Sequence, residues 1–391
     1  MATVLTPDFY SYQWAPLDAA TLDGAWVDVA WPDGKTLRCF ALWLAENVAE
    51  TGFEVKTRES IIDPSDLPPA ASIQGVSVSD EGGLRIDWHD GTTSAVHPGW
   101  LRHVADERHL PGSYLPAQEP WTAASLGAPP TTDGCAVLDD KQLLRQWLND
   151  MVRFGFARLR NTPVDPNFLG HLAAQIGPIR DTNFGAVWSV QAVLDPDSTA
   201  NTGLNLGQHT DLPTRETPPG FQFLHCIENS VQGGWSRMTD GRSLVGELEA
   251  NHPAVYEALT TLRWTFFNRS PGCDHRWTGP MIDLGSPDQP LTLRAFYPVR
   301  GFPAMPEKDV ARAYESMRVF SRLAHDPRFQ LRYPFAVGDL IGFDNRRMLH
   351  GRDSFDSQTG ARHLRGTYID QDDLFSTLRV LERDAEQESF T

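Results

Sequence analysis

The sequence predicts an α+β protein built mainly from β-strands, with a β-sandwich or barrel-like core and flanking helices. Short apolar segments separated by turn residues predict strands near 187–192, 220–226, 235–239, 262–267, 290–297, 339–344 and 362–369. Helices are expected over 140–154, where apolar side chains repeat at helical spacing, over about 165–176 and over roughly 307–324. Helices that flank many short strands are typical of such a core.

The N-terminal part of the chain predicts a separate small β domain. Alternating segments over 27–31 and 36–44 flank one Asp-Gly turn, and 84–88 and 92–97 flank another. Asp-Gly between alternating segments is a strong hairpin signal. Residues 105–134 are rich in proline, glycine, serine and threonine, which favours a linker. We therefore expect a β domain over 1–104, a linker over 105–134 and a second domain over 135–391.

Composition narrows the class of protein. The 391 residues carry 51 acidic and 34 basic side chains, a net charge of −17 that disfavours nucleic acid and anionic lipid as partners. The four cysteines form no Cys-x-x-Cys pair, so they indicate neither a disulfide framework nor a four-cysteine zinc site. No signal peptide or membrane-spanning apolar run is evident, so we expect a soluble cytoplasmic protein.

One tripeptide and one distant histidine suggest a metal site. His209-Thr210-Asp211 is the only His-x-Asp in the chain, and residues two apart on a strand face the same side. His350 follows an apolar strand and would supply a third ligand. Two histidines and one carboxylate form the facial triad of non-haem Fe(II) oxygenases, with open positions for a bidentate cosubstrate and dioxygen. The bare tripeptide could also place a histidine at the surface near a turn.

A fixed arginine would complete a 2-oxoglutarate site. The far carboxylate of that cosubstrate needs a planar, bidentate cation, which arginine supplies better than lysine. Arg362 lies twelve residues after His350, and strand alternation places it on one face with Leu364, Gly366 and Tyr368. If Arg362 points into the metal cavity, Tyr368 does too.

Several ordered motifs carry a resemblance to a known family. They are His209-Thr210-Asp211-Leu212-Pro213, Phe223-Leu224-His225-Cys226, Gly233-Gly234, Phe343-Asp344-Asn345-Arg346, Leu349-His350-Gly351-Arg352 and Arg362-His363-Leu364, with Trp43-Leu44-x-x-Asn47 and His97-Pro98-Gly99-Trp100-Leu101 near the N-terminus. With them the sequence resembles the γ-butyrobetaine hydroxylase branch of the Fe(II)/2-oxoglutarate-dependent dioxygenases over nearly its whole length.

The resemblance implies a double-stranded β-helix (jelly-roll) catalytic domain over 135–391 and an N-terminal β domain that helps to form a homodimer. It implies iron bound by His209, Asp211 and His350, with Arg362 on 2-oxoglutarate and Ser236 as a further cosubstrate candidate. Dioxygen is the second cosubstrate of such enzymes.

The N-terminal domain departs from the family pattern. The family's structural zinc is held there by three cysteines and one histidine, but the cysteine positions read Val48, Glu50 and Phe53, and only His97 remains. One imidazole cannot close a tetrahedral site. We therefore predict no structural zinc and a domain held by hydrophobic packing.

The substrate pocket departs as well. The family's aromatic cage for a trimethylammonium group corresponds to Phe184, Trp188, Asn201 and Tyr368, and Asn201 lacks a π face. The pocket then either binds the trimethylammonium cation more weakly or is adapted to a substrate with a different polar end. Two arginines, Arg294 and Arg300, could meet an anion such as a phosphonate, although arginines are also common at surfaces and in ion pairs. Phe184 and Trp188 could likewise be ordinary core aromatics.

The sequence thus predicts a dioxygenase that hydroxylates an unactivated C–H bond of a small trimethylammonium zwitterion. The resemblance makes 2-(trimethylammonio)ethylphosphonate and γ-butyrobetaine the leading substrates. One alternative is a 2-oxoglutarate oxygenase of another amino-acid or peptidyl substrate. Another is a binding module without metal, against which the intact His209, Asp211, His350 and Arg362 argue.

Overall fold

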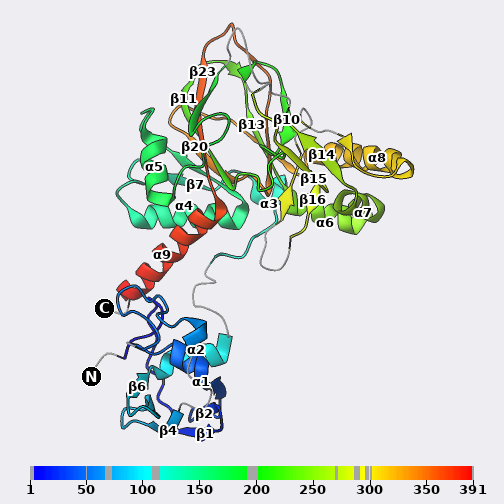
Figure 1. The fold of residues 1–391 in the computed structure, drawn as a ribbon. Helices are drawn as coiled ribbons and strands as arrows, with labels where there is room; N and C mark the ends of the chain where they lie inside the picture. The colour runs from blue at the N-terminus through cyan, green and yellow to red at the C-terminus, as the bar shows by residue number, and fades with distance from the viewer. Residues whose placement is uncertain are drawn as a thin grey trace. The chain divides into compact units, whose positions relative to one another are not determined.

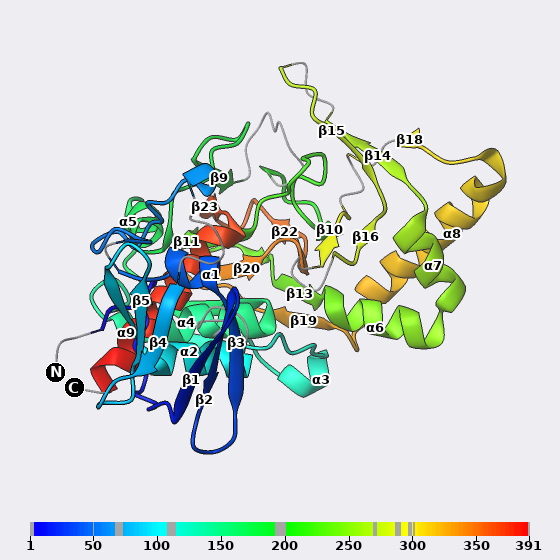
Figure 2. The same ribbon diagram turned by 60° about the horizontal axis from the view of Figure 1, so that its bottom comes forward.

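The computed structural model describes residues 4–49, 51–66, 73–107, 115–191, 201–268, 272–285, 291–295, 299 and 302–389. The chain divides into two compact units (Figures 1 and 2). Unit 1 comprises Met1–Tyr114 and Arg383–Thr391, and unit 2 comprises Leu115–Glu382. Among the helices of these ranges, none has the length and apolar character needed to cross a membrane.

Unit 1 contains two small antiparallel sheets. One is formed by β1 (Ala19–Asp23), β2 (Trp26–Ala30) and β3 (Thr36–Phe40), and the other by β4 (Ile73–Val78), β5 (Leu84–Trp88) and β6 (Thr93–Val96). Strand β3 ends at Phe40, where α1 (Ala41–Glu46) begins, so the strand expected to continue to residue 44 is a helix there. The short helix η1 (Pro64–Asp66) and α2 (Pro98–Glu107) complete the unit. Both sheets and both α-helices contribute to one apolar core.

Three of the four positions expected to have lost a zinc site have other roles in unit 1, and the fourth, Glu50, lies outside the described residues. Val48 lies in the apolar core, and Phe53 is buried. The His97 imidazole caps α2, because its Nδ1 accepts hydrogen bonds from the backbone N–H groups of Gly99 (3.1 Å) and Trp100 (3.2 Å). These residues pack or cap, and the absence of zinc stays a prediction.

Unit 2 is built on two larger sheets. The six-stranded sheet has the order β7-β8-β20-β11-β23-β9, and all its pairs are antiparallel except β7 with β8. Its strands are β7 (Thr131–Asp133), β8 (Phe156–Arg160), β20 (Leu340–Asp344), β11 (Phe221–Asn229), β23 (Arg362–Ile369) and β9 (Val187–Gln191). The four-stranded antiparallel sheet contains, in order, β10 (Leu206–His209), β21 (Met348–Arg352), β13 (Ser236–Asp240) and β19 (Gln330–Tyr333).

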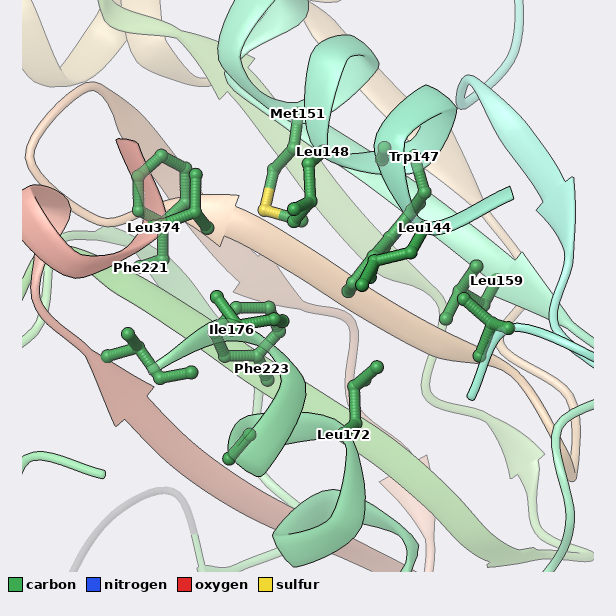
Figure 3. Close-up of a cluster of buried hydrophobic side chains, with 14 of the residues drawn as sticks. Leu144, Trp147, Leu148, Met151, Leu159, Leu172, Ile176, Phe221, Phe223 and Leu374 are labelled. Carbon is green, nitrogen blue, oxygen red and sulfur yellow. The ribbon is translucent and has the colours of Figure 1, made fainter. Parts of the chain in front are cut away.

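Helices cover the outer face of the six-stranded sheet. Side chains of α4 (Lys141–Phe154), α5 (Phe168–Ile176) and the first part of α9 (Gln371–Ser389) pack on Phe221 and Phe223 of β11 (Figure 3). The Asp140 side chain caps α4 by accepting from two backbone N–H groups, and Gly155, with φ of 82°, ends that helix. Alternation then turns Gln222, Leu224 and Cys226 toward the opposite face.

A third group of elements flanks the four-stranded sheet. Helices α6 (Gly241–Asn251), α7 (Pro253–Thr261) and α8 (Glu307–Ala324) share an apolar cluster with Leu349 of β21. Short strands accompany them: β14 (Trp264–Phe267), β15 (Arg276–Gly279), β16 (Ile282–Asp283), β17 (Thr292–Leu293) and β18 (Phe302–Pro303). Two further short strands, β12 (Gln232–Gly233) and β22 (Phe355–Asp356), pair with each other.

The two larger sheets share a buried cluster. Met238 and Met348 of the four-stranded sheet pack with Ile341, Phe343 and Leu364 of the six-stranded sheet. This packing confirms the predicted strand-rich core with flanking helices. The described parts of the expected linker 105–134 contain regular structure: α2 extends to Glu107, α3 (Ala123–Leu126) lies within the segment, and β7 joins the six-stranded sheet through parallel pairing with β8.

Candidate active site

Three potential metal ligands meet where the two sheets face each other. His209 is the last residue of β10 and pairs directly with His350 of β21, and their ring centroids are 4.1 Å apart. The Asp211 Oδ1 atom lies 3.3 Å from His209 Nε2 and 3.9 Å from His350 Nε2. Within the described ranges these are the only three such side chains whose ligand atoms converge, all within 4.8 Å of one another. This donor set fits a facially bound Fe(II).

The local backbone differs from the expectation of a continuous strand. Strand β10 ends at His209, and the next turn carries Asp211, followed by Leu212 with φ of 51°. A left-handed conformation is rare for a leucine and marks a tightly determined turn. The turn, rather than strand alternation, therefore brings the carboxylate to the imidazoles.

Neighbouring side chains fix Asp211 from two directions. The Asn345 amide accepts a hydrogen bond from the Asp211 backbone N–H (2.7 Å) and donates one to the Asp211 backbone carbonyl (3.0 Å). The Tyr368 hydroxyl donates to Asp211 Oδ2 at 2.7 Å. Oδ1 is thereby left facing the histidines. Hydrogen bonds to the other atoms of a ligating side chain commonly orient it in this way.

The electrostatics favour the ligating forms of these groups. Burial acts to raise the pKa of Asp211, but the hydrogen bond from His209, the nearby His350 and the Tyr368 hydroxyl hold that pKa well below its usual range. Burial, together with His209, lowers the pKa of His350 to about 3. The site therefore holds an ionised carboxylate and a neutral imidazole, which are the forms that bind a metal.

A cavity of about 440 Å³ opens over the triad. All four positions expected to form the cage line it, namely Phe184, Trp188, Asn201 and Tyr368. The Trp188 and Tyr368 rings are 4.3 Å apart and tilted by 31°, while Phe184 is 46% exposed. The structure thus brings together the cage positions and the candidate metal ligands in one pocket.

The predicted cosubstrate arginine also lines this cavity. Arg362 is 6% exposed, and Leu364 and Tyr368 of the same face line the cavity with it, as strand alternation predicted. Burial lowers the pKa of Arg362. A second lining arginine, Arg352, was not predicted from the sequence; it donates to the backbone carbonyls of Thr202 and Leu204, both at 2.7 Å.

Two other predicted residues, Arg294 and Ser236, lie outside the cavity lining. Arg294 does not line the cavity, because its terminal nitrogens donate to the carbonyls of Pro213 (2.7 Å), Arg215 (2.6 Å) and Glu216 (2.7 Å). The expected anion ligand is therefore a brace for the loop that follows Asp211. Ser236 lies in β13, opposite Tyr333, and is not among the residues that line the cavity. Arg300 falls outside the described residues.

Two further residues of the site were missed in the sequence. Gln222 lines the cavity from β11, and Asn345 supports Asp211 from the turn after β20. A signal for Gln222 was present, since it is the one amide in the strand segment from Phe221 to Cys226, on the same face as Leu224 and Cys226. Asn345 gave no such signal, because its partner lies 134 residues away in sequence.

A sandwich of two sheets with a His-Asp-His cluster, a buried arginine and an aromatic-lined pocket is the architecture of a metal-dependent oxygenase. The model of one family, described as taurine catabolism dioxygenase TauD, TfdA family, matches residues 117–368. The chain belongs to this family of dioxygenases, whose members use Fe(II) and 2-oxoglutarate.

Individual relatives extend the similarity beyond the family model. The chain is 37% identical over 375 residues to γ-butyrobetaine dioxygenase of Pseudomonas sp. (strain AK-1), covering 94% of this chain and 97% of that protein. It is 28% identical over 359 residues to the Homo sapiens γ-butyrobetaine dioxygenase, covering 88% and 92% of the two chains. It is 26% identical over 352 residues to mitochondrial trimethyllysine dioxygenase of Bos taurus, covering 87% and 82%.

Among solved structures, the chain is similar to asparagine oxygenase in complex with Fe(II), 2S,3S-3-hydroxyasparagine and succinate. The TM-score is 0.47 at 19% identity, over 58% of this chain and 79% of that one.

Proposed function

We propose that this dioxygenase hydroxylates an unactivated C–H bond of a small trimethylammonium zwitterion. The observation that carries the proposal is the pocket in which Phe184, Trp188 and Tyr368 lie beside the His-Asp-His triad. Aromatic faces attract a desolvated cation. The names of the relatives add support, since γ-butyrobetaine and trimethyllysine both carry a trimethylammonium group.

His209, Asp211 and His350 are the proposed iron ligands. Their convergent ligand atoms, all within 4.8 Å of one another, suit an Fe(II) ion. The iron, when bound, supplies the activation of dioxygen that the protein side chains cannot perform. One dioxygen, one 2-oxoglutarate and one substrate C–H bond then give one alcohol, one succinate and one carbon dioxide.

Arg362 is the proposed partner of the far carboxylate of 2-oxoglutarate. Its guanidinium is a permanent cation in a buried part of the pocket, where a charge-assisted pair with a carboxylate is strong. Leu224 and Leu364 line the same cavity and offer apolar contact to the methylene groups between the two carboxylates. The arginine thus sets the direction in which the cosubstrate enters the site.

Asparagine side chains are the proposed binding groups for the anionic end of the substrate. Arg294 is engaged with three backbone carbonyls, so it is not part of the proposed anion site. Asn183, Asn201 and Asn268 line the pocket, and their side-chain N–H groups can donate to carboxylate or phosphonate oxygens. Asn201 in place of an aromatic residue makes the cage more polar than one closed by four rings. We keep 2-(trimethylammonio)ethylphosphonate beside γ-butyrobetaine as candidate substrates on this ground.

A coupled-turnover screen tests the proposal. The enzyme is loaded with Fe(II) and 2-oxoglutarate under anaerobic conditions, mixed with oxygen, and assayed for succinate with γ-butyrobetaine, the trimethylammonium phosphonate, trimethyllysine, free amino acids and peptides. Choline and butyrate serve as fragments that keep only one charged end. We expect strong stimulation by one or more zwitterions and little by either fragment, with no succinate from Asp211→Ala. Stimulation by peptides or ordinary amino acids alone would refute the proposal.

The Asn201→Tyr variant tests the cage. A fourth aromatic face is worth about 0.5–2 kcal/mol for a cation, so γ-butyrobetaine should bind roughly 2- to 30-fold more tightly. If the preference between the carboxylate and the phosphonate does not change, Asn201 does not select the substrate.

Two features of the whole chain belong to the same proposal. We infer that unit 1 acts as a small separate domain without zinc, and that the enzyme works as a homodimer. Buried Val48 and Phe53 support packing in place of metal ligation. Light scattering of the purified protein should give the dimer mass, and elemental analysis should find no stoichiometric zinc.

A further inference from the structure

Gln222 is a buried amide that faces the active-site cavity. It lies on β11, is 4% exposed and lines the cavity with its neighbour on the same face, Leu224. Its Oε1 atom is buried without a hydrogen-bond partner. Within the described parts of the chain its Nε2 donates no hydrogen bond. A buried amide that is left unpaired costs roughly 1–3 kcal/mol of folding free energy.

The other described buried glutamines of unit 2 have protein partners. Gln371 donates to Asp344 Oδ2 at 3.0 Å and accepts from Arg346 at 2.6 Å. Gln208 donates to the Thr239 hydroxyl at 2.8 Å, although its Oε1 is buried without a partner. Gln222 differs from both because neither polar atom of its amide has a protein partner within the described residues. The N–H groups of such an amide can donate to an anionic ligand, whereas its oxygen can accept only from a donor such as water.

Strand register places Gln222 at the metal end of the pocket. It is directly opposite Tyr368 on β23 and Phe343 on β20. The Tyr368 hydroxyl contacts Asp211, and the Phe343 ring lies 4.7 Å from the His350 ring. The amide thus stands between two side chains that each touch a candidate iron ligand.

Arg362 lies at the other end of the same face. The inward residues of β23 run from Tyr368 through Gly366 and Leu364 to Arg362, and Leu224 of β11 is opposite Gly366. A linear cosubstrate with a carboxylate at each end spans such a row with one carboxylate on Arg362 and its keto-acid end near Gln222. The two leucines lie between these ends, where the cosubstrate has only methylene groups.

We propose that the Gln222 amide is a positioning and binding group for the keto-acid end of 2-oxoglutarate, donating a hydrogen bond to the carboxylate next to the keto group. An amide donor satisfies an anionic oxygen without adding charge to a site that already contains Arg352 and Arg362. The proposal depends on the cosubstrate and not on the identity of the hydroxylated substrate.

The test measures cosubstrate binding in Gln222→Met, which keeps the approximate size of the side chain without its amide. The variant and the wild type are titrated with 2-oxoglutarate in the presence of Fe(II) without oxygen, and the metal-to-ligand charge-transfer band is followed. The Kd for 2-oxoglutarate should rise about tenfold or more, as for the loss of a hydrogen bond to a charged group, and the band should shift. Thermal unfolding of the metal-free protein should occur at the same or a higher temperature, because an unpaired buried amide has been removed.

Two further variants make the result decisive. Gln222→Glu keeps the shape of the side chain and places a negative charge near the carboxylate, so its Kd should rise further even if methionine packs poorly. Gln371→Met removes a fully paired buried glutamine outside the cavity; it should lower the unfolding temperature and leave the Kd unchanged. An unchanged Kd and band position in both Gln222 variants would overturn the proposal. A loss of substrate binding with normal 2-oxoglutarate binding would overturn it too, because it would assign the amide to the substrate.

Discussion

The hydrogen bond between Tyr368 and Asp211 links the substrate cage to the metal site, and Tyr368→Phe isolates it. The hydroxyl is 2.7 Å from Asp211 Oδ2, and the tyrosine is fully buried, so water cannot replace the lost donor readily. A hydrogen bond to a buried charged group is worth about 1.5–3 kcal/mol. Loss of a hydrogen bond to a metal-ligating side chain weakens metal binding by roughly 10- to 100-fold. The phenylalanine ring keeps the contact with Trp188 and its face for the cation.

Anaerobic calorimetric titration with Fe(II), and with Mn(II) as a redox-stable substitute, measures this loss. The affinity for metal should fall by the stated factor, while the affinity for a trimethylammonium substrate at saturating metal should change by less than about threefold. Tyr333→Phe is a matched control, since Tyr333 is also buried in unit 2 but its hydroxyl has no partner in the described structure. Unchanged metal affinity with a large loss of substrate affinity would refute the reasoning, because the hydroxyl would then act on the substrate.

Two further predictions concern residues outside the cavity. Arg294→Met removes three hydrogen bonds to the loop after Asp211 and should lower the free energy of unfolding by roughly 3 kcal/mol. If the free energy of unfolding is unchanged and only the KM for the substrate rises, Arg294 binds the substrate anion and does not brace the loop. His225 is buried, and desolvation lowers its pKa from the ordinary value of 6.5 to about 4. In the unfolded chain His225 binds a proton below about pH 6.5, whereas in the folded protein it binds one only below about pH 4. The free energy of unfolding therefore falls as the pH falls through this window. Between pH 7 and pH 5 this group should contribute a loss of about 2 kcal/mol, measured by urea unfolding as the difference between wild type and His225→Gln. Equal pH dependence of the two proteins would contradict the assignment.

The protonation of His225 can be worked out from its neighbours. The Thr162 hydroxyl lies 2.9 Å from the Gly338 carbonyl, which can only accept, so the hydroxyl proton points there. The His225 Nε2–H must then donate to the hydroxyl oxygen at 2.9 Å, and Nδ1 is buried without a partner. A second proton on Nδ1 would have no acceptor in the described structure, which is consistent with the low pKa.

Local patterns were sufficient to predict much of the fold. The helices expected over 140–154 and 307–324 correspond to α4 and α8, and the strand expected over 362–369 is β23. Apolar side chains recur in these segments at helical spacing or alternate along a strand. The secondary structure that each segment prefers locally is therefore the one that its packing requires. The prediction of a strand up to residue 44 was wrong, because α1 buries Ala41 and Leu44 in the core of unit 1 at helical spacing. Tertiary packing overrides the local preference for a strand there.

The candidate site was predictable where chemistry restricts the residue type. One pocket contains the His-x-Asp pair, the later histidine, and the arginine that shares a strand face with Tyr368. A turn and not a strand supplies Asp211. Arginines were not predictable in the same way, because a guanidinium serves equally well on a ligand or on backbone carbonyls. Arg294 braces a loop 78 to 81 residues earlier in the chain, and only the tertiary fold reveals those partners.

The stoichiometry of turnover with a trimethylammonium zwitterion tests directly whether the protein is the proposed hydroxylase. Succinate and hydroxylated product are measured together, by nuclear magnetic resonance and mass spectrometry, after limiting 2-oxoglutarate is consumed with γ-butyrobetaine or 2-(trimethylammonio)ethylphosphonate. We predict one hydroxylated product for each succinate with at least one of the two compounds, and neither product with Asp211→Ala. Succinate formation that no trimethylammonium compound stimulates, or that yields no hydroxylated product, would contradict the account.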